Sequence, residues 1–187
     1  EGELKQWGIT YQLYDPMDLA DLSSRITPQT RLIWLEAAGS VTLEFPDVVE
    51  MVRLARSKGV LTALDNTWGA GLAFAPFDLE PAQGAMPLGV DISVHALTKF
   101  PSGGGDVLMG SVTTCDEHLA KQLKLSHMRM GLGVGANDAE LVLRSLPSTE
   151  LRYRQQDETA RALAAWCLQQ SAFAQVLHPA VVSSPGH

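Results

Sequence analysis

The sequence predicts an α/β fold in which a mostly parallel sheet is flanked by helices. Short apolar runs typical of strands alternate with longer segments whose apolar residues recur at helical spacing. The strand-like runs are apolar throughout and lack the alternation of a sheet with one face in water. These two observations predict a sheet that helices cover on both faces.

The first strand, helix and strand follow one another in the N-terminal third of the chain. Residues 31–36 (RLIWLE) are rich in strand-forming residues, as are residues 60–65 (VLTALD). Between them, residues 45–59 place apolar side chains on one helical stripe, with Pro46 suited to the first turn and Gly59 to a C-terminal cap. Parallel sheets are built from such strand–helix–strand units.

Two further strands are expected after a loop of some length. Residues 91–98 (DISVHALT) and residues 107–114 (VLMGSVTT) are both short and apolar enough to be strands. Residues 79–89 (LEPAQGAMPLG) lie in the loop before them. The sequence therefore predicts at least four strands.

The last third of the chain is helical in character. Asp116 is expected to cap one helix, and Asn137 or Asp138 a second one. Ser148 and Thr149 are expected to open a third helix, which runs from Glu150 to about Gln170.

The composition limits the classes of function. The 187 residues carry a formal net charge of −7, which argues against a nucleic-acid partner because such binding relies on clustered Lys and Arg. No apolar run approaches the roughly 18 residues that cross a bilayer, so no membrane partner is expected. Cys115 and Cys167 lie far apart and form no CxxC motif, which favours a reducing, cytoplasmic location.

Two patterns in the sequence predict no site of their own. Residues 131–136 (GLGVGA) fit the dinucleotide motif G-x-G-x-x-G/A, but helical residues precede them where a strand is needed, so a plain interhelical loop is expected. The histidines show no HExxH spacing and no grouping with cysteine, so no metal is expected. His95 is interpreted as a core histidine satisfied by a hydrogen bond.

Three polar clusters follow three of the predicted strands. They are residues 36–40, residues 65–68 and residues 98–105. The carboxyl ends of parallel strands meet at one edge of a sheet, where loops converge and ligands bind. Any chemistry is therefore expected at this edge.

Asp65 and Lys99 are the candidate pair at the edge. Alone, Asp65 could cap a turn and Lys99 could extend from a strand end into solvent. Together, a partly buried Lys99 would be a nucleophilic amine that binds a carbonyl, and Asp65 could keep the ring nitrogen of a pyridine aldehyde cofactor protonated. Thr98 would offer a hydroxyl to a phosphate. These requirements describe a pyridine aldehyde that carries a phosphate.

Longer segments around this pair resemble the pyridoxal-phosphate enzymes of cysteine and methionine metabolism, the transsulfuration family, and within it the cystathionine β-lyases. The resemblance covers nearly the whole chain. The segments that carry it are ALDNTWGAGLAFAPFD, VDISVHALTKFPSGGGDVLMGSV, LEAAGSVTLEFPDV and RMGLGVGANDAELVLRSLPSTELRYRQQDETARALAAW.

The resemblance implies roles for individual residues. Lys99 matches the lysine that binds the cofactor covalently, Asp65 the carboxylate on the pyridine nitrogen, and Thr98 a phosphate-binding hydroxyl. Ser40 stands where many members have an asparagine near the ring hydroxyl, and Ala96 where many have a second phosphate-binding serine. Lyase-like members vary at both of these places.

Trp68 and the loop of residues 79–89 have less defined expected roles. Trp68 either forms part of the site wall near the cofactor or fills the core beneath its loop. Residues 79–89 lengthen the connection between Asp65 and Lys99 beyond what is usual in the family that the chain resembles, and the site is expected to stay intact if they bulge outward.

The resemblance also implies the organisation and activity of the protein. Residues 1–148 would be part of the cofactor-binding large domain of a fold-type I enzyme, and residues 149–187 a connecting helix with the start of a small C-terminal domain. The chain resembles the middle of a longer enzyme, a dimer of dimers that splits cystathionine into homocysteine, pyruvate and ammonia. The alternatives are γ-elimination or γ-replacement within the family, or a fragment that keeps only the fold.

Overall fold

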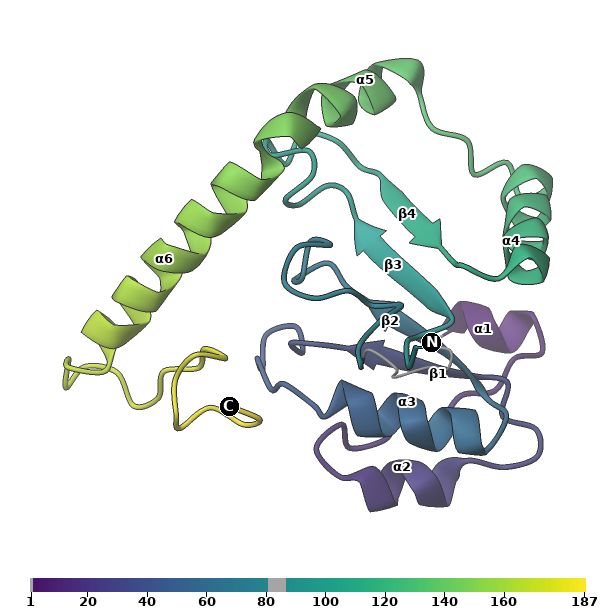
Figure 1. Cartoon of the computed structure of the whole chain (residues 1–187), viewed down its shortest axis with the longest axis horizontal. Coiled ribbons are helices and arrows are strands. Elements are labelled where there is room, and N and C mark those ends of the chain that lie inside the picture. Colours follow the sequence, from purple (N-terminus) through teal and green to yellow (C-terminus); the bar gives the residue numbers. More distant parts are fainter. Residues whose placement is uncertain (1, 81–86) are drawn as a thin grey trace.

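A computed structural model describes residues 2–80 and 87–187. Its centre is a four-stranded sheet in the order β1-β2-β3-β4 (Figure 1). The first three strands are parallel and the fourth is antiparallel to β3, so the mostly parallel sheet predicted from the sequence is confirmed. The strands are β1 (Leu32–Glu36), β2 (Leu61–Asp65), β3 (Ile92–Ala96) and β4 (Gly110–Thr113).

The third and fourth strands are shorter than predicted. β3 ends at Ala96, before Thr98, because the backbone then closes turns on itself: Lys99 N donates to Ala96 O at 3.2 Å and Ser102 N to Leu97 O at 2.9 Å. β4 begins only at Gly110. The consequence is that Lys99 lies on a turn beyond the sheet.

Helix α3 (Val48–Ser57) connects β1 to β2 as predicted. It begins two residues after Pro46, because the Asp47 side chain caps it by accepting a hydrogen bond from Glu50 N at 3.0 Å. Gly59 follows its last turn with a φ of 65°, a conformation that glycine adopts without strain.

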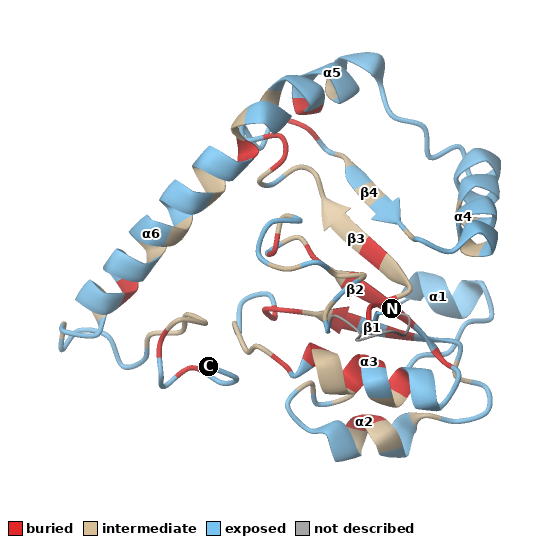
Figure 2. Cartoon of the chain, in the orientation of Figure 1, coloured by how far each residue is buried: buried red, intermediate tan, exposed pale blue. Residues whose placement is uncertain are grey.

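The core lies between α3 and one face of the sheet. Ile33, Leu35 and Leu64 point from β1 and β2 toward helices α3 and α2, which Figure 1 shows stacked on the same side. Figure 2 shows the buried residues concentrated in these elements. The buried side chains of α3 are Val48, Met51, Val52 and Ala55.

The other face of the sheet departs from the prediction that helices cover both faces. Leu32 and Trp34 of β1, Leu61 of β2 and Val112 of β4 alternate with the core residues and are between 38% and 51% exposed. In the part of the chain that the structure describes, the helices bury one face only, so this second expectation is wrong for the chain as it stands.

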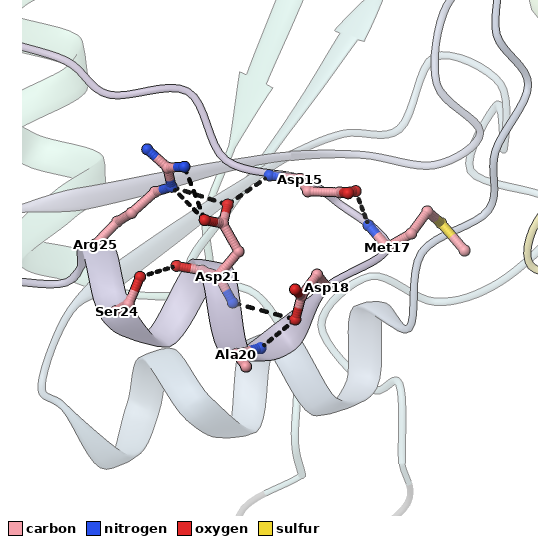
Figure 3. Close-up of polar contacts among 7 residues, drawn as sticks. All are labelled: Asp15, Met17, Asp18, Ala20, Asp21, Ser24 and Arg25. Carbon is pink, nitrogen blue, oxygen red and sulfur yellow. Dashed lines mark hydrogen bonds and ion pairs between the residues drawn. The ribbon is translucent and has the colours of Figure 1, made fainter.

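Two N-terminal helices were not predicted, α1 (Gly2–Gln6) and α2 (Leu19–Arg25). Polar contacts fix the start of α2 (Figure 3): Asp18 accepts from Ala20 N and Asp21 N, at 2.8 and 3.2 Å. Asp21 pairs with Arg25 one turn later and accepts from Asp15 N at 2.8 Å. The helix buries only Leu22, so it carries almost no hydrophobic pattern to detect.

The C-terminal third is helical, as expected. α4 (Glu117–Arg129) is capped by Asp116, which accepts from Leu119 N at 2.7 Å, and this prediction is confirmed. α5 (Ala136–Ser145) begins at Ala136 without a side-chain cap, so neither Asn137 nor Asp138 caps it. These two residues lie inside the first turn because the chain already turns into the helix at Gly135.

A 3₁₀ turn (Leu146–Ser148) joins α5 to the long helix α6 (Thr149–Cys167), which extends away from the sheet in Figure 1. α6 opens at Thr149 as predicted but ends three residues before Gln170. The glycines of residues 131–135 form the expected loop between α4 and α5. None of the helices in the described ranges is both long and apolar enough to cross a membrane.

The loop of residues 79–89 is described only at its ends. Leu79 N donates to Leu88 O at 2.8 Å, and Glu80 forms an isolated antiparallel bridge with Leu88. The expectation that the loop bulges outward concerns residues 81–86, which lie outside the described residues. Its two ends are held together beside the core.

Candidate active site

The three polar clusters meet at one edge of the sheet, as the sequence predicted. Parallel pairing places Glu36 of β1 opposite Asp65 of β2, and Asp65 opposite Val94 of β3. Each strand therefore delivers its following turn to the same side of the molecule. Asn66 N donates to Val94 O at 2.8 Å and extends the pairing one residue into the turn after β2.

Lys99 lines a cleft of about 980 Å³ beyond this edge. Trp68 from the turn after β2 lines it too, as do Ala37 and Ala38 from the turn after β1. Lys99 is exposed, so the expectation of a partly buried lysine is wrong for this chain. The physical reason is the early end of β3, which lets the backbone leave the sheet before it reaches Lys99.

Asp65 caps the turn that follows its strand. One carboxylate oxygen accepts from Thr67 N at 3.0 Å, while the Thr67 hydroxyl accepts from Ala96 N at 2.9 Å and ties this turn to β3. Among the described residues, the other carboxylate oxygen has no hydrogen bond. Asp65 is half-buried behind the cleft lining rather than on it. The turn-capping interpretation is thus correct, and it leaves half of the carboxylate for another partner.

The hydroxyl groups of Thr98 and Ser40, both predicted to bind the cofactor, form hydrogen bonds with other residues of the protein. The Thr98 hydroxyl lies 3.4 Å from Met109 O and 3.3 Å from Met109 N, across the start of β4. The Ser40 hydroxyl donates to the Glu36 carboxylate at 2.7 Å. Neither residue lines the cleft, so of the five predicted site residues the structure brings only Lys99 and Trp68 onto one surface.

His95 lies in β3 near Asp65, but no hydrogen bond to its ring is present among residues 2–80 and 87–187. The prediction of a hydrogen-bonded core histidine is therefore wrong. Burial lowers the pKa of His95 below its usual value, and the negative charge of Asp65 opposes this shift. The ring is half-buried and is held in its neutral form at neutral pH.

Sequence reasoning missed the contribution of Tyr153, the fifth residue of α6. Its hydroxyl donates to Trp68 O at 3.2 Å, and its ring meets Phe100 edge-on with centroids 4.9 Å apart. Burial is the main cause that raises the pKa of Tyr153. Tyr153 thus connects the Trp68 turn to the Lys99 turn. The only signal in the sequence was an aromatic residue beside arginines early in a helix.

The wall opposite Lys99 comes from α6 and the C-terminal segment. His178 and His187 line it, together with Asp157 and Arg161, which pair at 2.9 Å. The C-terminal segment is joined to the loop before α3, where Phe45 N donates to Pro185 O at 3.0 Å. No hydrophobic pattern in the sequence predicted this return of the chain end to the cleft.

The groups at this edge fit the cofactor expected from the sequence. An exposed primary amine can bind an aldehyde, and a carboxylate with one uncommitted oxygen can hold a protonated ring nitrogen. The cleft volume lies in the range of small-molecule sites. No group of three or more potential metal ligands occurs within the described part of the chain.

Comparisons with known proteins agree with this assignment of the cofactor. A family model described as "Cys/Met metabolism PLP-dependent enzyme" matches residues 1–187. The pyridoxal phosphate expected from the sequence is therefore confirmed as the cofactor of the family that the chain matches.

Two curated relatives are similar over the full length of the chain. A putative cystathionine β-lyase of Saccharomyces cerevisiae is 35% identical over 187 residues, which are 100% of this chain and 52% of that protein. A cystathionine β-lyase of Bordetella avium is 34% identical over 100% of this chain and 44% of its own length. The chain thus spans about half the length of the curated relatives it matches.

The fold also has solved counterparts. A cystathionine γ-lyase from Lactobacillus plantarum, complexed with L-serine, superposes with a TM-score of 0.86. It is 26% identical, and the match covers 94% of this chain and 44% of that one. The expected resemblance to the large domain of fold-type I enzymes is confirmed by this superposition.

Proposed function

Because the chain belongs to the Cys/Met metabolism family of PLP-dependent enzymes, we propose that it carries the cofactor centre of a carbon–sulfur lyase. We propose cystathionine as the substrate and β-elimination as the reaction. The observation that carries the proposal is Lys99, a free amine on the cleft wall at the sheet edge where Asp65 also ends its strand. Relatives named as cystathionine β-lyases support this choice of substrate.

Lys99 and Asp65 would bind different groups of the cofactor. Lys99 would hold the cofactor through its aldehyde, and Asp65 would lie at the ring nitrogen and accept a hydrogen bond from it. When bound, pyridoxal phosphate accepts the electron pair that remains when a proton leaves the substrate Cα. The Lys99 amine would be the base that takes up the proton from the substrate Cα.

The remaining predicted residues shape the site. Trp68 forms part of the cleft wall, and its main-chain carbonyl is held by the Tyr153 hydroxyl. Thr98 would contact the phosphate and Ser40 the ring hydroxyl only after releasing Met109 and Glu36.

Loss of the thiol from the β-carbon and addition of one water give homocysteine, pyruvate and ammonia.

A γ-lyase or γ-replacement enzyme of the same family is the second candidate. The superposed structure named as a cystathionine γ-lyase supports it. The two activities differ in which carbon–sulfur bond of cystathionine breaks. β-Elimination gives pyruvate, whereas γ-elimination gives cysteine and 2-oxobutyrate.

The setting of the enzyme belongs to the same proposal. We propose a cytoplasmic homo-oligomer, a dimer of dimers, acting on a small amino acid in methionine biosynthesis. Residues 1–148 would belong to the large domain, and residues 149–187 would lead into a small one. Both cysteines are free in the structure, in keeping with a reducing compartment.

The test uses the full-length protein that contains this chain, incubated with pyridoxal phosphate. Wild type is expected to show a visible absorbance band that borohydride removes, and to release pyruvate from cystathionine. Lys99→Ala should lose both, while Lys121→Ala, an exposed lysine on α4, should keep both. Normal pyruvate release by Lys99→Ala would contradict the proposal, and 2-oxobutyrate as the main wild-type product would select the second candidate.

A further inference from the structure

Arg152, in the first turn of α6, contacts the turn that carries Lys99. Its Nη1 donates to the carbonyl of Phe100, the residue after Lys99, at 2.6 Å. We propose that Arg152 is a positioning residue whose guanidinium holds the Lys99 turn against α6. The importance of this turn for chemistry rests on the proposed function, whereas the effect of Arg152 on the turn is independent of it.

The other donors of Arg152 bind the junction between α5 and α6. Nη2 donates to Ser145 Oγ at 2.9 Å and to Ser145 O at 3.3 Å, and Nε donates to Ser148 Oγ at 3.1 Å. Nη2 also donates to the Thr149 hydroxyl at 3.3 Å. The side chain is half-buried, and none of the ion pairs among described residues includes it. A planar guanidinium with five donors suits this set of neutral acceptors better than a lysine would.

The Lys99 turn requires a glycine at position 103. A Cβ on Gly103 would lie 2.7 Å from Arg152 Cζ and 2.8 Å from Ser145 Oγ, closer than atoms can approach. Its φ of 74° disfavours other residues as well. The glycine therefore makes room for the guanidinium.

Gly105 provides an internal comparison. It shares the left-handed conformation, with a φ of 68°, but a Cβ there would meet nothing within 4 Å. Alanine at either position suffers similar backbone strain, yet only alanine at Gly103 collides with Arg152. The difference between the two variants therefore reports the close contacts of position 103 with Arg152 and Ser145.

Outside its contacts with α6, the turn is bonded to Met109, just before β4, through the Thr98 hydroxyl. Ser102 Oγ donates to Thr98 O at 2.7 Å, and Gly103 N donates to Lys99 O at 3.1 Å, so both bonds stay inside the turn. The edge-on contact of Tyr153 with Phe100 is the second link to α6. Removing the guanidinium therefore leaves the turn folded on itself but loosely attached.

Hydrogen exchange of the full-length protein that contains this chain, prepared without pyridoxal phosphate, tests this inference directly. In Arg152→Met, peptides covering residues 97–105 should exchange at least about tenfold faster, the loss expected for charge-assisted hydrogen bonds. Peptides of β1 and α3 should keep their wild-type rates. Arg154→Met is the matched control, because Arg154 is exposed and, among the described residues, pairs only with Glu150 on the same helix. Equal exchange of residues 97–105 in the two variants would overturn the inference.

The glycine variants and a conservative replacement sharpen the test. Gly103→Ala should accelerate exchange of the turn well beyond Gly105→Ala, and should add little in the Arg152→Met background. Arg152→Lys should restore only part of the protection, since one ammonium cannot donate to Phe100, Ser145 and Ser148 at the same time. Should Arg152→Met fail to fold, Ser145→Ala, which loses the 2.9 Å contact, takes its place with a smaller expected acceleration. Full additivity, or an unchanged turn in Ser145→Ala, would count against the role of Arg152.

A final measurement links the turn to Lys99. Reduction with borohydride in the presence of pyridoxal phosphate should modify Lys99 more slowly in Arg152→Met than in Arg154→Met. If Lys99 is not modified even in wild type, the proposed function fails while the exchange result on residues 97–105 still decides the inference about Arg152.

Discussion

The helix-covered face of the sheet and its carboxyl edge are built from the same strands, yet they are held together in different ways. The face is closed by apolar side chains of β1, β2 and α3, with Leu35 fully buried at its centre. The edge is closed by polar contacts between distant segments, such as Tyr153 with Trp68 and Arg152 with Phe100. Stability is thus concentrated on the face, while the site depends on a small number of directional bonds.

The largest effect is expected from a cavity in the covered face. Leu35→Ala should lower the free energy of unfolding by about 2–5 kcal/mol, because it removes a side chain that is 0% exposed. Leu108→Ala, at a site that is 92% exposed, should change it by less than about 0.5 kcal/mol. Urea denaturation followed by circular dichroism measures both. Similar losses would show that the two regions do not differ as described.

Helix caps test the same difference between buried and exposed parts of the molecule, with smaller expected losses of stability. Asp47→Ala should destabilise the chain by about 1 kcal/mol, since α3 packs four buried residues onto the sheet. Asp116→Ala removes an equivalent cap from α4, which buries no residue in the described structure, so that helix should fray with little global effect. Thermal unfolding separates the two, and an equal decrease in Tm would argue against the comparison.

At the edge of the sheet, Tyr153→Phe should lower the free energy of unfolding by about 1 kcal/mol or less. This is the net value of one hydrogen bond, because the ring contact with Phe100 remains. Its visible effect should be local. Hydrogen exchange in the turn that contains Trp68 should accelerate, while β1 and α3 keep their rates. A uniform change across the chain would instead place Tyr153 in the global core.

The smallest effect is a pH dependence that originates at His95. Burial lowers the pKa of His95 in the folded chain, so the unfolded chain binds this proton more readily. The stability that the neutral His95 contributes to the folded chain is fully present above the unfolded pKa of about 6.5. It is lost as the pH falls below that value. His95→Gln should flatten the stability profile below pH 6.5, and His118→Gln, on the exposed surface of α4, should not. Parallel profiles for wild type and His95→Gln would contradict this origin.

The fold was more predictable than the site for a physical reason. Residues 31–36, 45–59 and 60–65 carry continuous apolar runs or a helical stripe, and burial of those side chains is what determines their structure. The coverage of the second sheet face could not be judged from the strands, since Trp34 and Leu61 have the same apolar character as the core residues.

The site depends on contacts that have no local pattern. Asp65, Lys99 and Trp68 could be proposed from the sequence because residue type and position at strand ends carry a chemical meaning. Arg152 and Tyr153 act across 52 and 85 residues on Phe100 and Trp68, and such contacts leave no signal in their own segment. The exposure of Lys99 was also missed, because it depends on where β3 stops pairing with β4.

The most direct test of the central claim is to locate the lysine that binds the cofactor. The full-length protein is loaded with pyridoxal phosphate, reduced with borohydride, digested, and its lysine-containing peptides are compared by mass. The expected result is one modified peptide, the one that contains Lys99. Modification of Lys5, Lys58, Lys121 or Lys124 in place of Lys99, or equal low labelling of all lysines, would contradict the assignment of this cleft as the active site.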